Sequence, residues 1–189
     1  TVSDPFVTQL ATLCRDQPTG AKWVIVPTHS LAHTIGDRLV LEGTNWANLR
    51  FKTPLDLALE VAAPFLVERG QNPVPDDIGP PLLMRLLAEL PPDVPAYFRH
   101  LAYQPTMATA LWRTVSELRM AGLGADQLQP TAFENRDKQA ELSALMHAYE
   151  RHLQTSGLAD TAAVFAEAID HPDYCPILLA DVVVEAPDV

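Results

Sequence analysis

The chain has 189 residues, of which 48% are hydrophobic and 20% are charged. This hydrophobic content argues against intrinsic disorder, and no apolar run reaches the ~20 residues needed to span a bilayer. We expect a soluble protein with no membrane partner. The formal net charge is −11 and is unevenly distributed. Residues 1–60 have six acidic and five basic residues, whereas residues 141–189 have nine acidic residues and one arginine. Because an acidic region repels phosphate backbones, we expect any DNA contact to involve the first part of the chain.

A helix, a buried strand and a second helix are predicted in the first 43 residues. Asp4-Pro5 opens the first helix. Trp23–Val26 is a continuous apolar run, as is typical of a parallel strand buried on both faces. Thr28 is an N-cap candidate, and one apolar stripe follows it at helical spacing, made of Leu31, Ile35 and Leu39.

The next residues repeat this strand-to-helix order. Asn48–Lys52 predicts a second strand, and Thr53-Pro54 predicts an N-cap followed by proline at the first helical position. Thr28 and Thr53 therefore follow the carboxyl ends of two strands, the edge where open α/β sheets bind ligands. The alternative is that both hydroxyls only cap their helices.

The composition changes after the third helix. Gly70–Pro81 contains four prolines and two glycines and predicts a long loop. The apolar spacing beyond it is helical, until Ile177–Val184 predicts a last buried strand. We therefore expect a three-layer α/β sandwich with a mostly parallel sheet, formed by residues 1–64 and 170–189. An all-helical insertion is expected at 65–169. A start at Thr1 and an end soon after the last strand indicate a part of a longer protein.

Sequence motifs for cofactors are missing. None of the eight glycines begins a GxxxxGK[ST] phosphate loop, and no GxGxxG occurs, so we expect neither ATP binding nor another cofactor. His29 and His33 have the spacing of two metal ligands, but no third ligand follows nearby. Glu185 and Asp188 follow the last strand, where a metal or a general base would be useful, although they are equally explained as exposed turn residues. The two cysteines form no CxxC motif and fit a reducing cytoplasm.

Four segments in this order resemble one protein family. They read VIVPTHSLAHTIGDRL, NLRFKTPLDLA, ALWRTVSELRMAGLGADQL and KQAELSALMHAYERHLQTSGLADTAAVFAEAI. The chain resembles the N-terminal helicase-like region of AddB-type subunits, which belong to bacterial ATP-dependent helicase–nuclease complexes with a PD-(D/E)XK nuclease. The resemblance covers most of residues 22–184. It implies the first domain of a superfamily-one helicase that has lost its motor function.

The resemblance also implies a role and a site. The role is that of a non-catalytic scaffold in recombinational repair of DNA double-strand breaks, beside a partner helicase or nuclease subunit. The family's exonuclease motif lies outside this chain. The segment of active relatives that corresponds to Val24–Leu31 lies beside single-stranded DNA, so the expected DNA-contacting residues are Thr28, Ser30, Arg50 and Thr53. Two alternatives remain open: a metal-dependent α/β enzyme that uses Glu185 or Asp188, and a module that binds a partner protein.

Overall fold

The computed structural model describes residues 4–74, 78–99 and 104–187, which form two compact units. Unit 1 consists of residues 1–64 and 167–189, and unit 2 consists of residues 65–166. The fold is mixed α/β, with a small parallel sheet and flanking helices in unit 1. The prediction of an α/β fold with a parallel sheet is therefore confirmed. None of the described helices is both long and apolar enough to cross a membrane.

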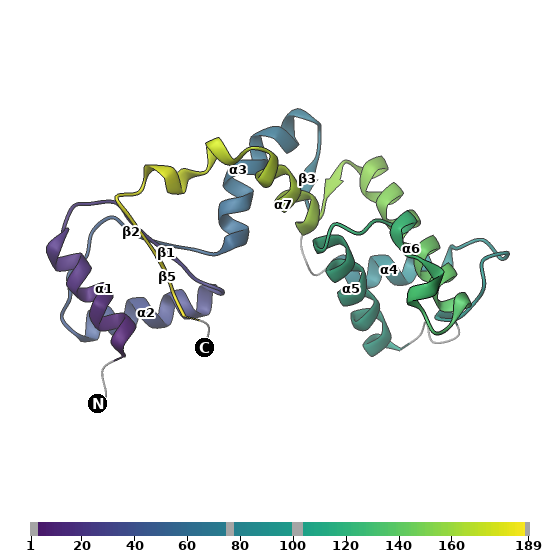
Figure 1. Cartoon of the computed structure of the whole chain (residues 1–189), viewed down its shortest axis with the longest axis horizontal. Helices are drawn as coiled ribbons and strands as arrows, with labels where there is room; N and C mark the ends of the chain where they lie inside the picture. Colours follow the sequence, from purple (N-terminus) through teal and green to yellow (C-terminus); the bar gives the residue numbers. More distant parts are fainter. Residues whose placement is uncertain (1–3, 75–77, 100–103, 188–189) are drawn as a thin grey trace. The chain divides into compact units, whose positions relative to one another are not determined.

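The sheet of unit 1 has three parallel strands in the order β2-β1-β5 (Figure 1). The strands are β1 (Lys22–Ile25), β2 (Leu49–Lys52) and β5 (Val182–Glu185). In the central strand, Val24 is paired with Phe51 on one side and with Val184 on the other. Trp23 and Val24 are almost fully buried, as predicted for a strand covered on both faces.

Two helices cover one face of this sheet. They are α1 (Pro5–Asp16) and α2 (His29–Leu41), and Figure 1 shows both on the same side of the strands. Their apolar stripes pack with alternate residues of β1 and β2 into one cluster, which includes Leu10, Val24, Ile35, Leu39 and Leu49. This period of two along the strands and of three to four along the helices is what the sequence spacing predicts.

The prediction for the last strand is wrong in extent and position. β5 begins only at Val182, whereas Pro176–Leu179 form a short 3-10 turn after a similar turn at Pro172–Tyr174. The prolines at the first position of each turn favour these turns over an extended strand. β5 also lies at the edge of the sheet, and alternate residues are exposed. The apolar run at Ile177–Val184 therefore does not form the continuous buried strand that its composition predicts.

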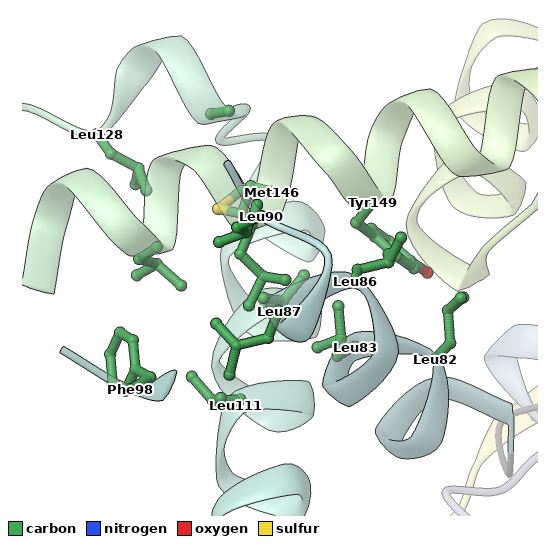
Figure 2. Close-up of a cluster of buried hydrophobic side chains, with 14 of the residues drawn as sticks. Leu82, Leu83, Leu86, Leu87, Leu90, Phe98, Leu111, Leu128, Met146 and Tyr149 are labelled. Carbon is green, nitrogen blue, oxygen red and sulfur yellow. The ribbon is translucent and has the colours of Figure 1, made fainter. Parts of the chain in front are cut away.

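Unit 2 is built on three helices, α4 (Gly79–Ala88), α5 (Pro105–Met120) and α6 (Arg136–Ser156). Figure 2 shows leucines of α4 meeting side chains of the other two helices in one cluster. Its most buried members, at 0% exposure, are Leu83, Leu87, Val115, Leu145 and Met146. Each such side chain contributes roughly 1.5–3 kcal/mol of hydrophobic stabilisation. Unit 2 also has short 3-10 turns at Ala125–Gln127 and Pro130–Ala132.

The expectation that residues 65–169 contain only helices is wrong, because two short strands pair within this range. β3 (Asn72–Pro73) and β4 (Leu158–Ala159) are parallel, and the N–H of Asn72 donates to the Gly157 carbonyl at 2.9 Å. Two residues are too few to show the alternation that marks a strand, and a proline argues against one. Pro73 fits because its neighbours Asn72 and Val74 supply the donors.

Two more helices, α3 (Pro54–Glu68) and α7 (Thr161–Asp170), contain the boundaries between the units. Asp160 caps α7, since its Oδ1 accepts the N–H of Ala163 at 2.9 Å. The same carboxylate accepts from Arg119 and from the Tyr149 hydroxyl. Burial and the charge of Asp160 raise the pKa of Tyr149, although the Arg119 charge opposes this, so the phenol stays protonated.

Candidate functional site

The candidate site is the edge of the sheet at which all three strands end. Because β1, β2 and β5 are parallel, their carboxyl ends meet there. Thr28 is the N-cap of α2 and lies three residues after the end of β1, and Thr53 directly follows β2. Glu185 is the last residue of β5 and is paired with Ile25. The structure thus brings Thr28, Thr53 and Glu185 to one edge, as expected.

At the start of α2, the Thr28 hydroxyl is used as an N-cap. Thr28 has extended backbone angles, and its Oγ1 accepts the N–H of Leu31 at 3.3 Å. Thr28, His29 and Ser30 are all exposed. The Ser30 carbonyl accepts from the Thr34 hydroxyl at 3.0 Å, and the Ser30 hydroxyl has no hydrogen-bond partner in the described part of the chain. The exposed hydroxyls of Thr28 and Ser30 can still donate to an external acceptor.

At the start of α3, a reciprocal capping box occupies the helix N-terminus. The N–H of Asp56 donates to Thr53 Oγ1 at 3.1 Å, and the N–H of Thr53 donates to Asp56 Oδ2 at 2.7 Å. Burial alone would raise the pKa of Asp56. The hydrogen bonds with Thr53 and the nearby charges of His29 and Lys52 outweigh that effect, so the pKa is lowered. A carboxylate of the chain itself therefore stands where an external anion would bind a free helix N-terminus.

The charges at this edge are paired within the protein. Lys52 forms an ion pair with Glu60, and His29 Nε2 lies 3.5 Å from Asp56 Oδ1. The exposed Glu185 adds a further negative charge. No surplus of positive charge exists among these residues, so a polyanion finds little electrostatic attraction at this edge.

Arg50 does not lie at the edge with the threonines, which corrects the expected grouping. It lies inside β2, paired with Trp23, and its guanidinium carbon is 5.5 Å from the centre of the Trp23 ring. This cation–π contact leaves the residue exposed on the sheet surface. The predicted strand Asn48–Lys52 already placed Arg50 two residues before the end of β2, but not over the Trp23 ring.

The structure provides no metal centre in the residues that it describes. No group of three or more potential ligands from histidine, cysteine, aspartate and glutamate comes together among them. His29 is paired with Asp56, and His33 lies on a shallow groove of α2 with Trp46 and Phe51. Asp188, the second residue of the expected acidic pair, lies outside the described residues.

Sequence reasoning missed two arrangements of charged residues. The first is the capping box of Thr53 and Asp56. The spacing Thr53-Pro54-Leu55-Asp56 matches the sequence motif of a capping box and could have predicted it. The second is a buried ion pair in unit 2, where Arg99 Nε donates to Oε1 of the fully buried Glu141 at 2.8 Å. The other Glu141 oxygen accepts the N–H of Tyr97 at 2.6 Å. No local pattern marks this pair, because its members are 42 residues apart.

A scan against protein-family models and a search of curated proteins found no match to this chain. A proposal for the function of this chain therefore depends on the geometry of the sheet edge and on the segments that carry the resemblance.

Proposed function

We propose that this chain is a non-catalytic, helicase-like scaffold region of a bacterial helicase–nuclease that acts in DNA double-strand-break repair. Its partners are another helicase or nuclease subunit and single-stranded DNA, which it contacts weakly. In this proposal, the sheet and the helices α1 and α2 are two of the three layers of a helicase-type first domain. The place of action is the cytoplasm, in keeping with two cysteines that form no disulfide.

One observation carries the non-catalytic part of this proposal: both helices at the sheet edge are capped by the chain itself. In nucleotide-binding α/β proteins, a glycine-rich turn leaves the N–H groups of a helix N-terminus free for phosphates. Here Thr28 caps α2, and Thr53 and Asp56 cap α3. The turn from β1 to α2 reads Val26-Pro27-Thr28 and contains no glycine.

Weak contact with single-stranded DNA is supported by the exposed groups beside this edge. The hydroxyls of Thr28 and Ser30 can donate to phosphate oxygens, and Arg50 is an exposed cation on the same sheet. Its stacking on Trp23 leaves edges of the guanidinium available to a phosphate. Since Lys52 is already paired with Glu60, we expect only one or two phosphates to be neutralised.

The DNA contact is tested by fluorescence anisotropy with a single-stranded oligothymidine over a salt series. The wild-type affinity should fall with a log–log slope of roughly −0.7 to −1.4, as expected for one or two contacts. Arg50→Ala should make the slope shallower by about 0.7, because one contact is lost. The control Arg113→Ala, in an exposed ion pair of α5, should not change it. No binding by the wild type, or a slope that Arg50→Ala leaves unchanged, would refute this DNA contact.

A further inference from the structure

The outer edge of β5 presents unused backbone groups. β5 is paired with β1 on one side and lies at the end of the described sheet. The N–H groups of Val182 and Ala186 donate to β1 and its flanking residue, at the carbonyls of Ala21 and Ile25. Because successive N–H groups of a strand point to opposite sides, those of Val183 and Glu185 point away from β1. The outer edge therefore has free donors and acceptors for another strand.

Large apolar side chains are exposed on β5 and on the turns that lead into it. Tyr174 is 67% exposed, Leu178 is 65%, Leu179 is 84% and Val183 is 47%. All four lie within ten residues of the sequence and within unit 1. Single exposed apolar residues are common, but a concentration of large ones in a free edge strand and in the turns that lead into it is typical of a protein-binding surface.

Within residues 170–187, every aspartate, glutamate, lysine or arginine is acidic. Asp170, Asp173, Asp181 and Glu185 are exposed, and no lysine or arginine follows Arg151 in the sequence. Asp181 accepts the N–H of Ala21 at 2.7 Å. Asp170, Asp173 and Glu185 form no ion pair within the described part of the chain. A partner that fits this surface must therefore be apolar and basic.

We propose that the outer edge of β5 binds an extended segment of a partner protein, in which an apolar residue has a lysine or arginine two positions before and after it, so that all three side chains share one face. The segment adds a strand to the sheet through the backbone groups of Val183 and Glu185. Its apolar side chain packs on Val183 and on the exposed leucines before it, and its cations face Glu185 and Asp181. This site is separate from the DNA contact, which involves the other two strands and their helices.

The test uses the full chain, labelled with ¹⁵N, and a short synthetic peptide with the sequence Thr-Lys-Thr-Val-Thr-Lys-Thr, whose valine and two lysines share one face when it is extended. Peptide addition should slow hydrogen exchange of the Val183 and Glu185 amides, and added salt should weaken the binding. A matched peptide with glutamate in place of both lysines should not bind. Glu185→Lys should lower the affinity for the lysine peptide and raise that for the glutamate peptide.

Val183→Pro separates the edge contact from the fold. It removes the outward N–H but keeps the bonds of Val182 and Ala186 to β1, so the circular dichroism spectrum should stay unchanged. Binding of the lysine peptide should be lost. Unchanged amide exchange on peptide addition, or equal binding of the two peptides, would overturn the proposal. A dimer in sedimentation velocity that buries the same amides without peptide would instead assign the edge to a second copy of the chain.

Discussion

Thr53 and Asp56 cap each other at the start of α3, with N–H to side-chain oxygen distances of 2.7 and 3.1 Å. This reciprocal contact closes one of the two helix N-termini at the carboxyl edge of the sheet. The order of strands and helices is that of a nucleotide-binding protein, but the capping box engages N–H groups at the start of α3 that would otherwise be free to bind a phosphate.

Asp56→Ala should destabilise the protein by about 1 kcal/mol, the usual value of a helix cap. Because the pKa of Asp56 is lower in the folded state, its stabilisation is present above the ordinary carboxyl pKa. It is lost as the pH falls through the folded-state pKa. Urea titrations from pH 7 down to about pH 3 should therefore show the difference between wild type and variant shrinking.

A double-mutant cycle checks that this effect belongs to the capping box. Thr53→Ala should cost about as much as Asp56→Ala, and the double variant should cost less than the sum, since each change removes the same contact. Additive losses would mean that the two residues act independently.

Removal of the buried carboxylate of Glu141 should be far more damaging. Glu141→Ala leaves Arg99 Nε and the backbone N–H groups of Tyr97 and Phe98 without their acceptor and removes the counter-charge of the guanidinium. Losing one partner of a buried ion pair costs about 3–5 kcal/mol. Glu117→Ala, which breaks the exposed pair with Arg113, should leave the urea midpoint unchanged. Similar midpoints for both variants would contradict a stabilising role of the contacts between Glu141 and residues 97–99.

Two glycines in helices should respond to alanine with opposite signs. A Cβ at Gly79 would lie 2.2 Å from Trp112 Cε2, so Gly79→Ala forces the indole out of place between α4 and α5. Such overpacking costs about 1–3 kcal/mol. A Cβ at Gly36 in α2 meets no atom within 4 Å, so Gly36→Ala should stabilise by about 0.5–1 kcal/mol. Thermal unfolding monitored by circular dichroism distinguishes the two; a neutral Gly79→Ala would contradict this packing.

Local signals in the sequence predicted the parts of the fold that depend on local physics. The spacing predicts Thr28 and Thr53 as caps, because small polar side chains before an apolar helical stripe satisfy free N–H groups. Asn48–Lys52 and Thr53-Pro54 gave the second strand and the start of α3 to within one residue.

Features that depend on distant residues were not predictable in this way. The β3–β4 pairing joins Asn72 to Leu158, and neither two-residue strand has a pattern of its own. The apolar character of Ile177–Leu179 indicated burial, but the prolines around it and the edge position of β5 leave it on the surface. The position of Arg50 over Trp23 follows from strand register, which only the assembled sheet defines.

The central claim is that the capped edge of the sheet does not bind nucleotide, and calorimetry with ATP and magnesium tests it most directly. We expect no heat of binding at millimolar ATP and no shift of the thermal unfolding midpoint, because Thr28, Thr53 and Asp56 already occupy the helix N-termini. A micromolar dissociation constant, accompanied by a higher unfolding midpoint, would contradict the non-catalytic assignment.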